Sequence, residues 1–300
     1  MFKNRFFLLV VICLLGCVSC SKYSKLLKST DNDAKYKAAL DYYEKKNYDR
    51  ALQLFDVMQA YYRSKPEGET ISYLTAECYY YKEDYYIASS YYKRFVAKYP
   101  FSKDAEDALF KSAICYYNLS PKFTLDQSDT YTAISEFQNF IDVYPRSPRV
   151  EEANGKIDTL RMKLEEKEYD ICNLYFKMEE YQAAITSYEA FMKDHPMTVH
   201  REEILNNMVI NYFRYAENSV KAKQRERYEL AVEKYNTLCY VYPDSPYIAQ
   251  LAPTIEKIME KLEKYQLFCA CSVIALGIFA SSLVFASRIS KDENMTIDFL

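Results

Sequence analysis

The sequence of 300 residues contains no tryptophan and only four glycines and two histidines. A protein with many tight β-turns needs more glycine, because glycine most readily supplies the positive φ angles of such turns. Two histidines leave little for acid–base chemistry, and no glycine-rich phosphate loop, Gly-x-Ser-x-Gly or His-Glu-x-x-His motif is present. We therefore expect neither a sheet protein nor an enzyme, and no metal or cofactor.

A surplus of charge of one sign is also missing. The chain carries 39 basic and 42 acidic residues, a formal charge of −3. Nucleic-acid binding proteins usually show a basic excess or stripe, so we expect no nucleic-acid partner. Tyrosine is abundant instead, with 32 copies. Its large ring and polar tip suit helices that face a partner as well as a core.

Cysteines with the spacing of metal ligands are absent from the middle of the chain. The four cysteines there are far apart in the sequence, and each lies within an amphipathic helical pattern: Cys78, Cys115, Cys172 and Cys239. We expect them to be small buried apolar residues rather than a disulfide or metal framework.

A repeated phrase organises most of the chain, namely an alanine followed twelve residues later by a proline. The four copies are Ala88 with Pro100, Ala133 with Pro145, Ala184 with Pro196, and Ala231 with Pro243. A tyrosine or histidine precedes each proline, at Tyr99, Tyr144, His195 and Tyr242, and a hydroxyl residue follows it, at Ser102, Ser147, Thr198 and Ser245. The small alanine lets a neighbouring helix approach closely, and the proline ends the helix. The hydroxyl residue then caps the next helix, and Pro148 and Pro246 suit a first helical position.

Successive copies of this phrase are 45 to 51 residues apart, which is typical of repeats built from helix pairs. A second phrase, polar-Tyr-x-x-Ala, opens several second helices, beginning at residues 47, 84, 180 and 227. It is typical of tetratricopeptide repeats, and we expect its tyrosine and alanine to form the seam between helices. The predicted fold is an all-α tetratricopeptide solenoid of about five helix pairs in a right-handed superhelix, closed by a capping helix over 246–265.

The expected helices follow from apolar residues at helical spacing, separated by turn signals. They begin near residue 33 and cover 48–62, 70–82, 84–98, 104–117, 128–143, 148–177, 180–193, 201–218 and 224–239. The stretch 148–177 is either one long helix or two nearly continuous ones.

Residues 1–20 have a basic start, an apolar run and a boundary of small residues, which together predict a secretory signal peptide. Lipoprotein signals end in a small residue before the cysteine that is lipidated, and two cysteines fit. Cys20 is our choice because it leads directly into the polar tether of residues 21–31, and Cys17 is the alternative. An ordinary cleaved signal is the remaining interpretation. Residues 32–265 form the repeat domain.

The tail over 266–300 departs from the rest of the chain. Residues 267–286 contain no charge, and this length can span a bilayer as a helix. A buried terminal helix, or a scar from a frame change or fusion, would give the same composition. If the segment spans, the protein would be retained in the inner membrane with Arg288 and Lys291 inside.

The lipoprotein signal, the tether and the degenerate helix pairs together resemble the BamD (YfiO) family of outer membrane assembly lipoproteins. The phrases that carry the resemblance are 23–31, 120–127 with Ala133 and Ile134, 164–169 leading to Tyr175, and 194–198. The resemblance covers residues 17 to about 265.

This resemblance implies a non-catalytic lipoprotein of the complex that assembles β-barrel proteins, anchored by lipid on the periplasmic side of the outer membrane. C-terminal repeats of the family bind the periplasmic domains of the central barrel protein, and N-terminal repeats receive unfolded barrel substrates. The substrate groove would then lie on the first two helix pairs, at Tyr36, Tyr43, Tyr73, Tyr79 and Tyr80. A concave surface lined with tyrosine also suits aromatic barrel strands on physical grounds.

Two other functions stay open. A helical-repeat lipoprotein of a nutrient uptake system would hold glycans or peptides at the cell surface, but such proteins typically offer tryptophan platforms, which this chain lacks. A general periplasmic scaffold for envelope complexes would need no feature beyond the repeats.

Overall fold

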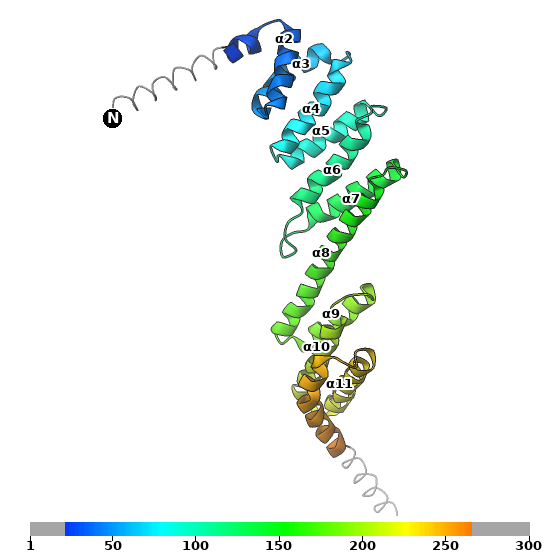
Figure 1. The fold of residues 1–300 in the computed structure, drawn as a ribbon. Coiled ribbons are helices and arrows are strands. Elements are labelled where there is room, and N and C mark those ends of the chain that lie inside the picture. Colours follow the sequence, from blue (N-terminus) through cyan, green and yellow to red (C-terminus); the bar gives the residue numbers. More distant parts are fainter. Residues whose placement is uncertain (1–21, 266–300) are drawn as a thin grey trace, which may run out of the picture. The chain divides into compact units, whose positions relative to one another are not determined.

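The computed structural model describes residues 22–265, and every regular element in this range is an α-helix (Figure 1). A helix over 22–28 precedes five helix pairs, and a helix over 246–265 follows them. The paired helices are α2 (Asn32–Glu44) and α3 (Tyr48–Tyr62), α4 (Glu67–Tyr81) and α5 (Tyr85–Lys98), α6 (Ala105–Leu119) and α7 (Ser128–Val143), α8 (Val150–Lys177) and α9 (Tyr181–Asp194), and α10 (Arg201–Glu217) and α11 (Lys221–Val241). The predicted all-α repeat array with a final capping helix is confirmed, and its right-handed sense stays a prediction. The signal peptide with Cys17 and Cys20 and the apolar segment 267–286 lie outside the described residues.

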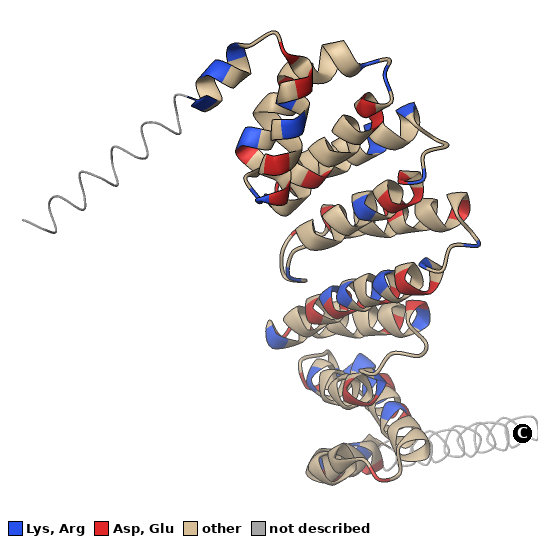
Figure 2. Ribbon diagram, turned by 45° about the horizontal axis from the view of Figure 1, so that its top comes forward, with Lys and Arg blue, Asp and Glu red and all other residues tan. Residues whose placement is uncertain are grey.

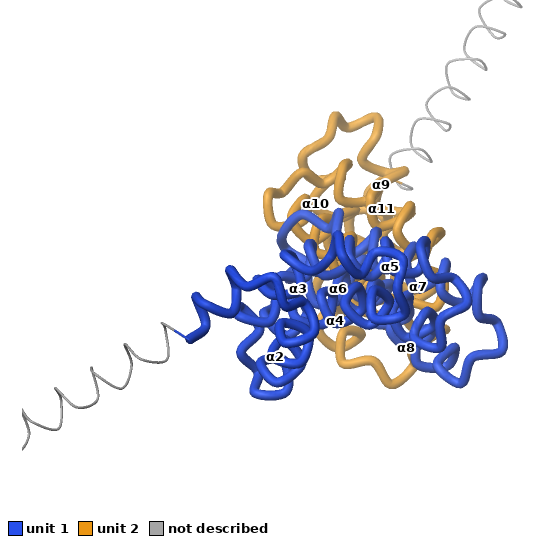
Figure 3. The backbone as a smooth tube through the Cα atoms, turned by 90° about the horizontal axis from the view of Figure 1, so that it is seen from above, with its two compact units in different colours: residues 1–164 blue, residues 165–300 orange. Residues whose placement is uncertain are grey.

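The chain divides into two compact units, residues 1–164 and 165–300, and the division falls within α8 (Figure 3). The described part of unit 1 holds the first three helix pairs and the first half of α8. Unit 2 holds the second half of α8, then α9 to α11 and the helix over 246–265. The sequence left open whether the stretch 148–177 forms one long helix or two. The structure shows one helix of 28 residues there, α8.

The junction after each second helix has the same backbone. The residue before the proline leaves the helical region, with φ between −122° and −131° and ψ between 61° and 69° at Tyr99, Tyr144, His195 and Tyr242. The hydroxyl oxygen three residues later accepts the backbone N–H two positions further on, at 3.1 to 3.2 Å, in Ser102, Ser147, Thr198 and Ser245. Ser245 caps the helix over 246–265 in this way, because Tyr247 is the second residue of that helix. The other three hydroxyls bond residues that lie just before α6, α8 and α10, and α6 and α10 begin without a side-chain cap. The predicted cap is therefore confirmed for Ser245 and is wrong for Ser102 and Thr198.

The alanines of the repeated phrase lie where helices touch. Ala88, Ala133, Ala184 and Ala231 have no exposed surface. Seven residues later in each copy a large apolar side chain is also buried, at Phe95, Phe140, Phe191 and Leu238. Alanine admits the neighbouring helix, and the larger residue two turns on fills the space that the close approach leaves. The predicted seam is confirmed for its alanines, whereas of its tyrosines Tyr228 is buried and Tyr48, Tyr85 and Tyr181 are half-buried.

The four cysteines of the helical body are free thiols, and three of them are buried. Burial raises the pKa of both Cys78 and Cys115 to about 12. Such thiols carry almost no thiolate at neutral pH and are unreactive. The interpretation of these cysteines as apolar core residues is confirmed for Cys78, Cys115 and Cys172, whereas Cys239 is half-buried.

Part of the segment predicted as a tether, residues 21–31, packs on the first helix pair. Its residues 22–28 are helical. The hydroxyl of Tyr23 donates to Gln53 Oε1 at 2.8 Å, and the Tyr23 ring meets Tyr42 edge to face at 5.5 Å. Leu26 and Leu27 join the same apolar cluster. The segment looks polar in sequence because its apolar residues are few, but those few are the ones that contact the repeats.

We expect Phe140→Ala to destabilise the protein strongly, because the Phe140 ring is fully buried against Phe110 at a centroid distance of 5.1 Å. Loss of a buried phenylalanine costs about 3–5 kcal/mol. Urea unfolding followed by circular dichroism measures the change. Val143→Ala, at a position on the same helix that is 52% exposed, is the control and should cost less than about 0.5 kcal/mol. Equal losses in the two variants would contradict the packing described for α7.

Candidate protein-binding site

Within residues 22–265, no three His, Cys, Asp or Glu side chains converge as ligands of a metal ion would. Both histidines of the chain instead contact glutamates of α8. His195 Nε2 lies 2.7 Å from Glu168 Oε2, and His200 Nε2 lies 3.0 Å from Glu166 Oε2. The His200 ring also stacks on Tyr169 at 3.8 Å. The two histidines thus fasten the α9–α10 connection to α8, which is a structural role.

The five tyrosines predicted to line a substrate groove lie on α2 and α4, and all are half-buried. Two of them are hydrogen-bond donors to carboxylates: Tyr43 to Glu77 Oε2 at 3.5 Å, and Tyr73 to Asp107 Oδ2. The other three pack on neighbouring rings, Tyr36 on Tyr62, Tyr79 on Tyr91, and Tyr80 on Tyr85. The structure therefore brings Tyr43 and Tyr73 into one polar network and gives each of the others a separate ring partner.

Glu77 is the centre of that network. Its side chain is only 4% exposed, and Lys111 Nζ donates to its Oε1 at 2.7 Å. The buried Tyr92 hydroxyl donates to the same oxygen. A buried carboxylate is stable only when its charge is balanced and its oxygens accept hydrogen bonds, and these groups supply both. The network thereby ties α2, α4, α5 and α6 together.

Asp107 extends the network along the first helices of the pairs. It accepts from Lys111 at 3.0 Å and from Arg149 Nη1 at 2.6 Å. Burial alone would raise the pKa of Asp107, but hydrogen bonds from Tyr73 and Lys111 outweigh burial, and the pKa is lowered. Burial opposes the charge of Lys111 as well, but Glu77 and Asp107 outweigh it and raise the pKa of this lysine. Both groups therefore stay charged at neutral pH.

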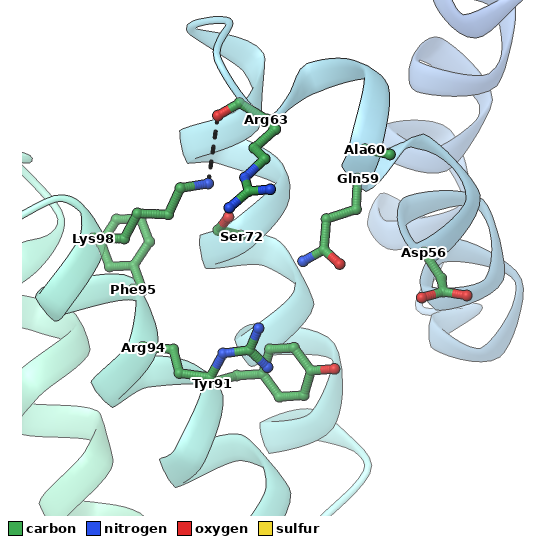
Figure 4. A pocket seen from close by; sticks show the side chains of 9 residues that line it. All are labelled: Asp56, Gln59, Ala60, Arg63, Ser72, Tyr91, Arg94, Phe95 and Lys98. Carbon is green, nitrogen blue, oxygen red and sulfur yellow. Dashed lines mark hydrogen bonds between the residues drawn. The ribbon is translucent and has the colours of Figure 1, made fainter.

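A hollow of about 430 Å³ lies between α3 and α5, over α4. Its lining is Asp56, Gln59, Ala60, Arg63, Ser72, Tyr91, Arg94, Phe95 and Lys98. Figure 4 shows the side chains of Gln59 and Arg63 on one side and those of Arg94 and Lys98 on the other, around one space. We call the three cations Arg63, Arg94 and Lys98 the basic triplet.

The basic triplet is free of carboxylate partners. Within the described residues, none of its members makes an ion pair. Lys98 Nζ donates to the backbone oxygen of Arg63 at 3.5 Å and lies over the Tyr99 ring at 4.8 Å. The Arg94 guanidinium lies over the Tyr91 ring at 5.1 Å. This contrasts with the acidic and basic residues interspersed along the helices of both units (Figure 2). Three unpaired cations beside an aromatic ring suit a carboxylate that is attached to an apolar or aromatic group.

The sequence did not single out the basic triplet. Tyr91, Arg94 and Lys98 do share one helical face, since they are three and four residues apart. That spacing is equally typical of a solvated helix surface, and Arg63 comes from a different helix pair. Among the predicted groove residues, Tyr79 stacks on Tyr91 of the lining at 5.1 Å, and Tyr73 meets Phe95 of the lining edge to face at 5.3 Å.

We expect the stability contributed by Asp107 to depend on pH. Because its pKa is lower in the folded protein, this contribution is present above the unfolded value of about 4 and is lost as the pH falls through the folded value. Asp107→Asn should therefore lower the free energy of unfolding by about 1–3 kcal/mol at pH 7 and by less at about pH 3, which lies below the unfolded pKa. Urea titrations at both pH values test this. Asp158→Asn, at an exposed position on α8, is the matched control. A loss of equal size at both pH values would contradict the charged state assigned to Asp107.

Among the described residues, no helix is both long and apolar enough to cross a membrane. No curated protein matches the sequence. Three solved structures share 11–15% identity with it. The match to the tetratricopeptide domain of P58(IPK) covers 79% of this chain and 68% of that one, with a TM-score of 0.37. The match to the TPR2AB domain of yeast Sti1, in its pHSP90 complex, covers 77% and 98%, also with a TM-score of 0.37. A repeat protein of Bacteroides fragilis covers 80% and 100% at 0.35.

The family match is of a different kind. The YfiO family, described as outer membrane lipoprotein, matches residues 28–230, about two thirds of the chain and all of its helix pairs up to the first half of α11. The matched region includes the basic triplet, the Glu77 network and both histidines. The resemblance stated from the sequence is thereby confirmed: this chain belongs to the YfiO family of outer membrane lipoproteins.

Proposed function

We propose that this protein is a non-catalytic component of the machinery that assembles β-barrel proteins in the outer membrane. Membership of the YfiO family supports the envelope location. An array of helix pairs presents long surfaces for other proteins and needs no catalytic group. The observation that carries the proposal is the basic triplet, three cations that form no ion pair with a carboxylate of the described residues and that line one hollow of the N-terminal unit.

In this proposal the hollow receives the C-terminal end of an unfolded barrel strand. Such strands alternate aromatic and polar residues, and their last residue has a free carboxylate. Arg63 and Arg94 would bind that carboxylate, because a guanidinium donates two parallel hydrogen bonds to it. The exposed part of the Tyr91 ring, supported by Tyr79, would contact an aromatic side chain of the strand.

The remaining tyrosines predicted for the groove then have a supporting role. Tyr43 and Tyr73 hold the first helices of the pairs in place through Glu77 and Asp107. Tyr36 and Tyr80 fill space between helices. We propose that the N-terminal repeats receive substrate. The fourth and fifth helix pairs, α8 to α11, would bind the periplasmic domains of the central barrel protein.

Lipid attached to Cys20, with Cys17 as the alternative, would hold the protein on the periplasmic side of the outer membrane. One acyl chain binds membranes only weakly, so stable anchoring needs more than one chain or a second signal. Mass spectrometry of the mature N-terminus identifies the modified cysteine.

Affinity purification from membranes with a tag inserted after Lys22 tests the assembly role. We expect recovery of a large barrel protein that has periplasmic domains. Recovery of a surface transporter with glycan-binding proteins instead would reject the proposal in favour of the nutrient uptake alternative.

Peptide binding tests the hollow separately. We expect a fluorescent peptide that ends in an aromatic residue with a free carboxylate to bind, and Arg94→Gln to weaken binding about tenfold, the loss typical of one charge-assisted contact. The amidated peptide should lose a similar factor. Arg146→Gln, which removes the same charge from an exposed turn, is the control. Equal binding of the acid and amide peptides would exclude a carboxylate site in the hollow.

A further inference from the structure

α8 is much longer than the other paired helices, with 28 residues against 13 to 21. In its first half, Ala153, Ile157 and Leu160 are buried in a cluster with residues of α6 and α7. These three positions follow the spacing of three and four residues that keeps side chains on one face of a helix. One face of α8 is thus a packing face in unit 1.

The same face continues into the second half of α8. Steps of seven residues lead from Ile157 through Leu164 to Ile171 and then to Met178, just after the helix, and Leu174 lies two such steps after Leu160. Here the face is exposed: Ile171 is 44%, Leu174 53%, Tyr175 39% and Met178 60% exposed. We call these four residues the α8 stripe.

The other side of this half of α8 is already occupied. Tyr169 and Cys172 are buried in a cluster with residues of α9 and α10. The α8 stripe is therefore not the core-facing side of the helix. The stripe has apolar residues at helical spacing and continues a face that packs on helices. Such a surface is better suited to packing against another helix than to exposure to water.

The charged residues beside the α8 stripe indicate which helix would pack on it. Asp170 and Lys177 are exposed, seven residues apart on the same flank, and neither makes an ion pair within the described residues. If two copies of α8 lie antiparallel, with their two-fold axis between Asn173 and Leu174, Asp170 of each copy lies opposite Lys177 of the other. Flanking charges of this kind set partner and orientation in antiparallel helix pairs.

We propose that the α8 stripe is the contact between two copies of this chain, with the two α8 helices antiparallel. The stripe covers only about two helical turns, so the contact is smaller than a stable interface of standard size. The dimer should therefore be weak in solution, with a dissociation constant of about 10–100 µM. Copies confined to one membrane surface meet at a higher effective concentration, which favours the pair.

Sedimentation velocity of the full chain in detergent, from about 1 to about 200 µM, tests the proposal across the expected range. The wild type should shift from monomer to dimer. Ile171→Asp should abolish the shift, and Lys177→Asp should raise the dissociation constant at least about tenfold by placing two aspartates opposite each other. The double variant Asp170→Lys with Lys177→Asp should bring the dissociation constant back to within about threefold of the wild-type value, because the exchanged charges again match. Met162 is 62% exposed and lies on the opposite face of α8, so Met162→Asp should leave the dissociation constant unchanged.

Several outcomes would overturn the proposal. A wild type that stays monomeric over the whole range excludes the contact. Dimerisation that survives Ile171→Asp arises elsewhere, for instance in the apolar segment 267–286. Failure of the charge exchange to restore a dimer lost in Lys177→Asp means that the stripe serves a different helix. Circular dichroism and the melting temperature show that each variant is folded, so that a lost dimer is not a lost fold.

Discussion

The structure depends on one constraint, which is the close contact between helices at an alanine that lies twelve residues before a proline. The alanines of this phrase have no exposed surface, and any larger side chain there would force the helices apart. The proline then ends the helix at a fixed distance, and the following hydroxyl accepts a backbone N–H in the turn that leads to the next helix or at its start. Contact, stop and turn are thus set by residues close together in the sequence wherever the phrase occurs.

This locality explains how much of the fold could be predicted. The approximate positions of the helices, the buried alanines and the buried cysteines follow from neighbours along the chain. Residues whose role depends on distant partners could not be assigned in this way. Tyr23 looked like part of a tether because its partner Gln53 is thirty residues away. Helical spacing placed Tyr43 and Tyr73 on one side of their helices but could not show that carboxylates of the chain already accept from them.

The candidate site differs from the network around Glu77 and Asp107 in how its charges are balanced. Glu77 and Asp107 are matched by Lys111 and Arg149, and such a satisfied buried network holds helices rigidly in place. The basic triplet has no such partners, although it lies in the same unit. Which cations are paired and which are unpaired appears only once the helices are assembled, since the whole sequence has nearly equal numbers of basic and acidic residues. Because the helices are rigid, the unpaired cations between them are already in position. An anionic group can therefore bind there with little reorganisation of the protein.

The central claim, that the hollow receives unfolded barrel proteins, is tested most directly in living cells by photo-crosslinking. A photoreactive amino acid in place of Gln59, which lines the hollow, would report what lies beside Arg63 and Arg94 during barrel assembly. The same probe at Lys103, an exposed position outside the lining, is the reference. We predict crosslinks to newly made barrel proteins at residue 59 and few at residue 103. Crosslinks at residue 59 only to other partners, or equal yields at the two positions, would contradict the account.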